Sequence, residues 1–403
     1  MILTLTAGYP FGGEPFLISE DLYAPEELIY LALHPSKEEN QSRHRGIRIA
    51  EKRNVFVMAI WALRGLGDPL VWHEMGWMRK NRKLSLHNIG VMLGYYAYAK
   101  RCYREIYRWM KSENLLRKDT IMYSYWMVTH AMVCALVKRK VPNMRILTRC
   151  HGYDIYEYRY PGEYLPFRDF IFRSMDAICP ISADGVHYLE QTYAESLEKQ
   201  KISLHRLGTL EKGATPPKRK GEPFRLVSCS SMIPLKRIHL LIAALSKIGQ
   251  PVEWVHFGDG PLMSTLQNQA KDTLSQTSVQ YIFKGHVPNE EVLQYYKENH
   301  VDVFLNVSET EGVPLSIMEA LSFGIPVIAT KVGGTGEIVT SGLNGTLLPK
   351  DVAPSALSNA IRDMMVRSDE ERNTMCRKAR ESWEKNCSAE KNYRDFYAMV
   401  QNR

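Results

Sequence analysis

The chain has 403 residues, of which 45% are hydrophobic and 24% are charged, with a formal net charge of +8. This length exceeds what one hydrophobic core usually supports, so we expect two domains, and the composition excludes disorder, collagen-like repeats and coiled coil. The seven cysteines form no Cys-x-x-Cys pair, which favours a reducing compartment and argues against a disulfide framework or a structural zinc site.

The chain opens with MILTLTAGYPFGGEPF, which lacks the basic start and long apolar run of a signal peptide. Residues Ile2–Thr6 predict a short strand, and Gly8–Glu14 predict a loop with glycines directly after it. Positive charge then gathers in residues 79–149, which hold 16 Lys and Arg against 3 Asp and Glu, with aromatic residues between them. Such a region suits nucleic acid, anionic lipid or a phosphorylated acceptor, and a solvated helix face is the plain alternative.

Residues 120–137 carry no formal charge, but they are few for a transmembrane helix and include Ser124, Thr129 and His130. We expect a buried strand over Thr120–Tyr125 followed by a helix that packs on the sheet, and no membrane-spanning segment. Further strands are predicted at Arg145–Cys150 and Ala177–Ile181. Strands that alternate with helices indicate parallel β-α-β units.

Residues 208–223, GTLEKGATPPKRKGEP, are predicted to be an interdomain linker because glycine, adjacent prolines and a basic run break regular structure. The alternation then resumes, and the tail from Ala353 is predicted to be helical. The fold class is therefore α/β, with two doubly wound domains, residues 1–207 and 208–384, that face each other across a ligand-binding cleft. Predicted strands here are Phe224–Ser228, Val252–Phe257, Gln280–Phe283, Val301–Asn306 and Pro326–Ala329, and predicted helices are Leu235–Lys247 and Pro314–Phe323.

The most informative stretch is SETEGVPLSIMEALSFGIPVIATKVGGTGEIV, which begins at Ser308. Pro314 is predicted at the first position of a helix, where its missing N–H costs nothing, so the amides of residues 312–316 point out of the helix N-terminus. Such an end is an anion site, and a diphosphate suits it. Glu311 and Glu319 would repel phosphate, so we expect one carboxylate to reach a ribose and the other a hexose.

The run from Glu311 to Glu319, with the glycine-rich VGGTGEIV after it, resembles the E-x7-E signature of the retaining glycosyltransferases of family 4. The resemblance covers nearly the whole chain and implies the GT-B fold, with two Rossmann-like domains and a C-terminal helix, residues 385–403, that crosses back to the first domain. Both glutamates also lie in Ser-x-x-Glu frames, which makes helix capping the alternative. Capping does not explain the register of either glutamate with the glycines.

The resemblance implies roles for individual residues. Glu311 would contact the hexose and Glu319 the ribose, and His151, in the segment TRCHGYD, would lie near the anomeric centre or the 6-hydroxyl. HFGDGPL from His256 resembles a strand-to-turn segment of the family. The predicted catalytic residues are His151, Lys236 and Glu311, and the predicted donor-binding residues are Gly12, Gly13, Ser231, Lys236, His286, Val287, Glu311, Gly312, Val313, Pro314, Leu315, Ser316 and Glu319.

One segment departs from the family pattern, which usually has G-R-x-x-x-x-K-G with both cations on the leaving diphosphate. This chain keeps the lysine as Lys236 but has Ser231 at the arginine position. Arg237 is an alternative cation, although an adjacent helical residue projects about 100° away. Because the sequence has no Asp-x-Asp triplet, we predict that Lys236 and the amides of residues 312–316 neutralise the leaving group without a metal or cofactor. No covalent nucleophile stands out, so attack on the same face with the phosphate as base is our hypothesis.

The sequence thus predicts a hexosyltransferase of bacterial surface polysaccharide synthesis, such as capsule or O-antigen. It would use a UDP- or GDP-sugar and a lipid-linked oligosaccharide acceptor, with no nucleic acid partner. We expect it in the cytoplasm, bound to the inner face of the plasma membrane through residues 79–149. One alternative is a catalytically weak or silent GT-B scaffold that binds glycan or membrane, motivated by Ser231. A dinucleotide-dependent oxidoreductase lacks the G-x-G-x-x-G it would need after the first strand.

Overall fold

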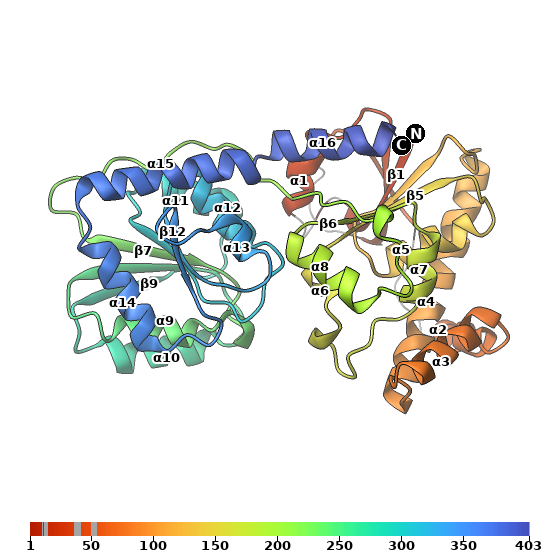
Figure 1. The fold of residues 1–403 in the computed structure, drawn as a ribbon, viewed down its shortest axis with the longest axis horizontal. Coiled ribbons are helices and arrows are strands. Elements are labelled where there is room, and N and C mark those ends of the chain that lie inside the picture. The colour runs from red at the N-terminus through yellow and green to blue at the C-terminus, as the bar shows by residue number, and fades with distance from the viewer. Residues whose placement is uncertain (10, 12–14, 36–41, 50–54, 403) are drawn as a thin grey trace. The chain divides into compact units, whose positions relative to one another are not determined.

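The computed structural model describes residues 1–403 except 10, 12–14, 36–41, 50–54 and 403 (Figure 1). The chain divides into two compact units. Unit 1 comprises Met1–His205 and Tyr393–Arg403, and unit 2 comprises Arg206–Asn392. The sequence-based boundaries, at 207 and 384, differ from this division by two and eight residues.

Unit 1 is built on a six-stranded parallel sheet in the order β3-β2-β1-β4-β5-β6. Its inner strands are almost entirely buried, as parallel strands covered by helices on both faces must be. The order reverses between β1 and β4, so this sheet is doubly wound as predicted. The strands are β1 (Ile2–Tyr9), β2 (Leu28–Pro35), β3 (Arg45–Arg48), β4 (Ile121–Ser124), β5 (Arg145–Cys150) and β6 (Ala177–Pro180).

Two of the longer helices of unit 1 begin at side chains that cap them. Asp68 accepts a hydrogen bond from the Leu70 amide at the start of α3, and Ser85 accepts one from the Asn88 amide at the start of α4. The helices are α1 (Pro15–Asp21), α2 (Val55–Gly65), α3 (Pro69–Lys80), α4 (Leu86–Ser112), α5 (Thr129–Lys138), α6 (Gly152–Ile155), α7 (Arg168–Ser174) and α8 (Ala183–Thr192).

The uncharged stretch 120–137 forms β4 and α5, and residues 129–137 are all buried in the core of unit 1. The expected buried strand and helix are therefore present. Within the described part of the chain no single helix is long and apolar enough to cross a membrane. The pair α2 and α3 meets that criterion together by length and composition, with a bend of 79° between them.

Unit 2 repeats the architecture with the order β12-β11-β10-β7-β8-β9, again all parallel. Its predicted strands are confirmed to within two residues at each end. They are β7 (Phe224–Cys229), β8 (Val252–Phe257), β9 (Val279–Phe283), β10 (Val303–Asn306) and β11 (Val327–Thr330), joined at the edge by β12 (Gly345–Leu348). The helices are α9 (Ile238–Leu245), α10 (Met263–Leu274), α11 (Asn289–Glu298), α12 (Leu315–Ser322), α13 (Thr335–Ile338), α14 (Pro354–Met365), α15 (Asp369–Asn386) and α16 (Ala389–Asn402), which continues into unit 1.

Residues 208–223 form no helix or strand, as their composition predicted, but they belong to unit 2 and are bound along it. The Thr209 amide donates to the Cys387 carbonyl at 2.9 Å, and the Thr215 amide donates to the Phe323 carbonyl at 3.2 Å. Lys218 pairs with Asp302 at 2.8 Å. These partners lie 84 or more residues away in sequence, so the local composition gave no sign of them.

The last part of α16 closes one face of the unit 1 sheet. Phe396, Tyr397 and Val400 are buried there with Tyr123 of β4. Arg145 of β5 donates to the Val400 carbonyl at 2.5 Å and to the Met399 carbonyl at 3.1 Å, which satisfies carbonyls that the helix end leaves free. Residues far apart in the sequence, such as Ile2 and Val400, thus belong to one hydrophobic core.

We expect Phe396→Ala to destabilise unit 1 by about 3–5 kcal/mol, because it empties a buried aromatic site against Tyr123 and Arg149. Asp395→Ala, one residue earlier on the exposed side of α16, should change stability by no more than about 0.5 kcal/mol. Urea unfolding followed by circular dichroism and by tyrosine and tryptophan fluorescence measures both. Equal stability of the two variants would contradict the proposed packing.

Candidate functional site

The candidate site of unit 2 lies where the strand order reverses. The chain runs outward from β7 through β8 and β9, and then from β10 through β11 and β12 in the other direction, with β7 and β10 paired side by side. The loops that follow these two strands therefore leave the sheet on opposite sides of one point. In doubly wound sheets such a point, at the carboxyl ends of the strands, is where ligands bind.

An ion pair joins these two loops. Lys236 ends a short 3-10 turn after β7, Glu311 lies in the loop after β10, and the Lys236 Nζ is 2.6 Å from the Glu311 Oε1. The two side chains are 21% and 11% exposed, and the Asn306 amide donates to the same carboxylate oxygen at 3.4 Å. The structure thus brings together two of the three predicted catalytic residues, and both side chains are mostly buried.

The helix-capping interpretation of the two glutamates is wrong. The cap residue of α12 is Pro314, which has no side-chain donor or acceptor, and no side chain caps this end. Glu311 is bonded to Lys236, and Glu319 accepts a hydrogen bond from Asn289 at 2.9 Å. Pro314 itself lies one position earlier than predicted, immediately before the helix. Its carbonyl accepts from the Ile317 and Met318 amides, so α12 begins at the expected place.

The N–H groups of residues 312, 313, 315 and 316 belong to the entrance of α12, where an α-helix leaves N–H groups without intrahelical acceptors, and Pro314 between them has no N–H. The backbone of the loop after β11 packs directly against the start of this helix. Gly333 has a positive φ of 49°, and a Cβ at this position would lie 2.1 Å from the Glu311 carbonyl oxygen. The Gly334 amide donates to the Gly312 carbonyl at 2.7 Å. The glycines of the motif are thus required because two backbone segments touch here.

Arg237 is not the replacement for the arginine that Ser231 lacks. Its guanidinium donates to the carbonyls of Val307, Ser308 and Lys350 at 2.7, 3.1 and 2.8 Å. It therefore holds the loop after β10 in place. Ser231 is exposed, and its carbonyl accepts from the Ile233 amide at 3.0 Å.

Glu319 is the second glutamate of the motif, and it projects from α12 toward the start of α11. Burial raises its pKa to about 7, and the nearby Glu290 adds to this effect, while the hydrogen bond from Asn289 opposes it. The side chain is therefore a carboxyl group that changes charge close to neutral pH, which is common at functional sites.

The loops after β7, β8 and β9 are joined by their backbones. The Met232 amide donates to the Asp259 carbonyl at 2.8 Å, and the Gly258 amide donates to the Gly285 carbonyl at 2.8 Å. His286, exposed, and Val287, half-buried, follow directly in the turn before α11. These two predicted donor-binding residues thus lie in a turn at the carboxyl edge of the same sheet as Lys236.

His151 lies in unit 1, at the carboxyl end of β5. Its backbone amide donates to Asp154, and its Nδ1 is 3.6 Å from the Asp154 Oδ2. The imidazole is buried between the rings of Trp126 and Tyr125, with centroids 4.1 and 5.0 Å away, and burial lowers its pKa. The predicted histidine is therefore a neutral, stacked side chain.

Trp126 was missed by the sequence analysis. It follows β4, at the carboxyl end of the strand beside the order reversal of unit 1, and its ring packs against those of His151 and Tyr153 at tilts of 48° and 53°. A signal existed, because Trp126 comes directly after the predicted strand Thr120–Tyr125. The predicted residues Gly12 and Gly13 lie outside the described part of the chain.

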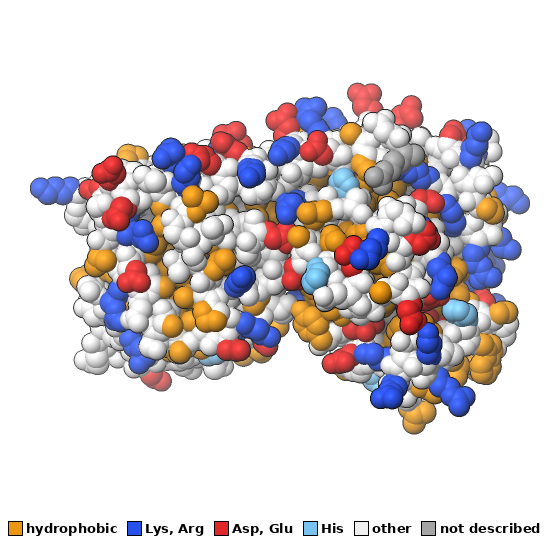
Figure 2. Space-filling model, in the orientation of Figure 1, with side chains coloured by type: hydrophobic (Ala, Val, Ile, Leu, Met, Phe, Trp, Pro, Cys, Tyr) orange, Lys and Arg blue, Asp and Glu red, His pale blue; other side chains and the backbone are white. Residues whose placement is uncertain are grey.

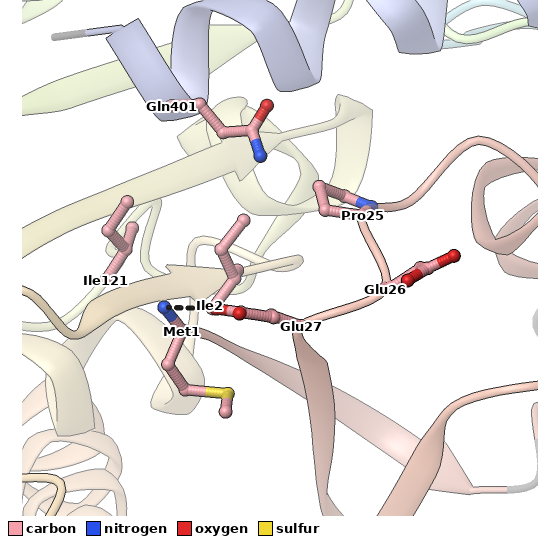
Figure 3. Close-up of a pocket in the computed structure, with 7 residues that line it drawn as sticks. All are labelled: Met1, Ile2, Pro25, Glu26, Glu27, Ile121 and Gln401. Atoms are coloured by element: carbon pink, nitrogen blue, oxygen red, sulfur yellow. Dashed lines mark ion pairs between the residues drawn. The ribbon is translucent and has the colours of Figure 1, made fainter.

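Two other features complete the survey. Among the described residues, no three His, Cys, Asp or Glu side chains are grouped to hold a metal ion. A cavity of about 390 Å³ opens in unit 1, where the Met1 amino group is 3.6 Å from Glu27 (Figure 3). It lies at the amino ends of β1 and β4, opposite the edge where ligands bind doubly wound sheets. Its lining residues are Met1, Ile2, Pro25, Glu26, Glu27, Ile121 and Gln401.

Comparison with known proteins agrees with this geometry. Residues 214–382 match the family described as glycosyl transferases group 1. WcaL of Escherichia coli K12, provisionally named a colanic acid biosynthesis glycosyltransferase, is 26% identical over 268 residues, which is 64% of each chain. AmsK of Erwinia amylovora, an amylovoran biosynthesis glycosyltransferase, is 26% identical over 243 residues, or 58% of each chain. Both alignments span less than two thirds of the relative's length.

Two solved structures share the fold over the whole chain. Anabaena HepE, solved in complex with UDP and glucose, has a TM-score of 0.70 at 16% identity and covers 100% of this chain and 99% of its own. The apo form of the lipopolysaccharide outer core galactosyltransferase WaaB has a TM-score of 0.69 at 15% identity, with 100% of both chains covered. The protein is thus an α/β protein of the GT-B fold. The predicted fold class is confirmed, and residues 214–382 match the group 1 glycosyltransferase family, as the resemblance in the sequence indicated.

We expect Arg237→Met to loosen the loop after β10, because three carbonyls lose a charged donor and a buried unpaired carbonyl costs about 1–3 kcal/mol. Amide hydrogen exchange at residues 307–311 should accelerate by about tenfold or more. Arg219→Met, at an exposed position of the same unit, is the matched control. Unchanged exchange in the Arg237 variant would show that other contacts hold the loop.

Proposed function

We propose that this protein transfers a sugar from a nucleoside diphosphate sugar to a glycan acceptor during polysaccharide biosynthesis. The observation that carries the proposal is the Lys236–Glu311 ion pair at the strand-order reversal of unit 2. It lies within the residues that match the group 1 family. The proposal is supported by the UDP and glucose bound to HepE and by the names of WcaL and AmsK, which assign them to polysaccharide synthesis.

Donor binding would break the Lys236–Glu311 ion pair. The Lys236 ammonium would turn to the diphosphate, together with the amides at the entrance of α12, and Glu311 would become free to accept hydrogen bonds from sugar hydroxyls. As the bond from the anomeric carbon to the diphosphate oxygen breaks, negative charge grows on that oxygen. A fixed ammonium and fixed amides stabilise this charge without reorganising. Glu319 would accept from the ribose.

The finer features of the reaction belong to the same proposal. We propose a hexose donor carried by UDP or GDP, retention of configuration, independence of metals and cofactors, and His151 beside the transferred sugar. The acceptor would be a lipid-linked oligosaccharide, handled at the inner face of the plasma membrane in the cytoplasm. The second candidate is a weakly active or silent GT-B scaffold, which is favoured by the uncharged Ser231 in place of the family arginine.

Donor turnover tests the reaction. The purified chain, with EDTA, is given a panel of UDP- and GDP-sugars, and released nucleoside diphosphate is measured. One donor should be hydrolysed slowly, and Lys236→Met and Glu311→Ala should each lower that rate by about 10²–10³-fold. Lys247→Met, an exposed lysine of the same unit, is the control.

Each other outcome of the panel has its own meaning. A rate that appears only when a divalent cation is restored would overturn the metal-independent part. Donor binding without turnover, by Lys236→Met and the wild type alike, would favour the silent scaffold.

The Glu319 carboxyl predicts a pH dependence. Its pKa of about 7 lies above the ordinary value of 4.5, so between these values the folded chain holds a proton that the unfolded chain lacks. If the ionised form accepts from the ribose, affinity for the donor should rise by about tenfold from pH 6 to pH 8. A nucleotide sugar is the right probe because its diphosphate diester does not titrate in this range. Calorimetry on Glu319→Gln should give a weak, flat profile, and a wild-type profile that is also flat would contradict the assignment.

A further inference from the structure

An apolar surface of unit 1 is unexplained by the proposed reaction. Of the fifteen large hydrophobic side chains that are exposed in the described chain, nine lie within residues 55–91. They come from α2, the bend after it, α3 and the start of α4. In Figure 2 hydrophobic side chains gather over α2 and α3 at the lower right, with Lys and Arg side chains beside them. Contiguous apolar patches of this kind mark interaction sites.

Helix α2 differs from an ordinary surface helix because large apolar side chains lie on its exposed side. Four large apolar side chains are exposed on this helix, most of them at helical spacing: Val55, Phe56, Ile60 and Leu63, at 81%, 83%, 51% and 69% exposure. The one charged residue of this helix is Arg64, at its end. The opposite side is anchored, because a Cβ on Gly65 would lie 2.8 Å from the Tyr96 ring of α4. The apolar face of α2 therefore points away from the core.

The bend between α2 and α3 is also fixed in place. Asp68 caps α3 and is bonded to Lys100 and to the Tyr96 hydroxyl, at 2.8 and 2.7 Å, both on α4. Trp72 donates to the Leu66 carbonyl at 2.8 Å, yet its ring is 56% exposed. The indole thus has a satisfied polar end and a bare apolar face, as tryptophans at membrane interfaces do.

The charges around this surface identify its partner. Residues 55–112 contain ten Lys and Arg against three Asp and Glu. Two of the cations pair with acids of other segments, Lys80 with Glu195 and Lys83 with Glu157 and Glu163. Of the three acids, Asp68 pairs with Lys100, Glu74 is buried and Glu105 pairs with Arg108, so positive charge remains in excess. A second copy of the chain would bring the same positive charges against this surface. An anionic lipid surface instead offers opposite charge to the Lys and Arg and hydrocarbon to the apolar side chains.

We propose that α2 and α3 dock on an anionic bilayer and insert their apolar side chains into it, lying in the interface. Helices of 11 and 12 residues are each about 16–18 Å long, which is too short to cross a hydrocarbon core of about 30 Å, and the 79° bend prevents them from forming one span. This deepens the proposed membrane attachment by residues 79–149, which rests on charge alone, and it does not require that the transfer reaction be correct.

Vesicle co-sedimentation of the full chain tests the inference. With vesicles of phosphatidylcholine and phosphatidylglycerol at 7:3, binding should be strong at low salt, and a bound fraction should remain in 0.5 M NaCl because inserted side chains are not screened. Phe56→Ser with Leu63→Ser should lower the salt-resistant binding by about tenfold or more. The control is Leu343→Ser with Val366→Ser, which removes two apolar residues of unit 2 that are 41% and 79% exposed.

The outcomes separate the possibilities. Wild-type binding that is fully reversed by salt would overturn insertion and leave attachment by charge. Absence of binding to any vesicle, with a concentration-dependent dimer that the Phe56 and Leu63 variant abolishes, would assign the surface to a second copy. Donor turnover without vesicles is measured on the same variant and should be unchanged, which distinguishes this inference from the proposed reaction.

Discussion

The site of unit 2 depends on holding two loops in register although no covalent link joins them. The loops leave β7 and β10, which are parallel neighbours. From this pair the strand order extends toward opposite edges of the sheet. Arg237 fixes the loop after β10 through the Val307 and Ser308 carbonyls, and Lys236, the residue before it, reaches Glu311 from the same turn. The guanidinium of Arg237 thus positions the backbone of the loop, whereas the ammonium of Lys236 forms an ion pair that a bound donor can replace.

Unit 1 differs from unit 2 because it contains a fully buried ion pair. Arg149 and Glu20 pair at 3.1 Å with almost no exposure, and burial raises the pKa of Glu20. Such a pair is costly to bury, and the face of Phe396, 4.1 Å from the guanidinium, offsets part of the cost. Arg145 lies on the same face of β5, where it binds α16. The strand that ends at His151 is therefore tied to the C-terminal helix at two points.

Much of this was readable from the sequence. Strand patterns gave β5 and β8 to the residue, the E-x7-E motif located Glu311 and Glu319, and the G-R-x-x-x-x-K-G pattern located Lys236. Three strands were missed. β2 is an eight-residue, largely apolar run that the sequence analysis did not single out, whereas β3 is four residues with an arginine at each end and β12 is four residues that begin with glycine. The role of Arg237 and the packing of Trp126 against His151 depend on partners far apart in sequence. The same cause hid the attachment of residues 208–223 to unit 2, since Lys218 finds Asp302 only in the folded chain.

Because residues 393–403 belong to unit 1, unit 2 is an insertion within it. The order of synthesis then matters. Residues 206–392 contain a complete sheet and core, so this unit can fold as soon as it leaves the ribosome. The earlier-made residues 1–205 must wait, since Phe396 and Val400 are made only after unit 2. Until then the face that α16 covers, which includes Tyr123 and Leu147, stays open to chaperones and to aggregation.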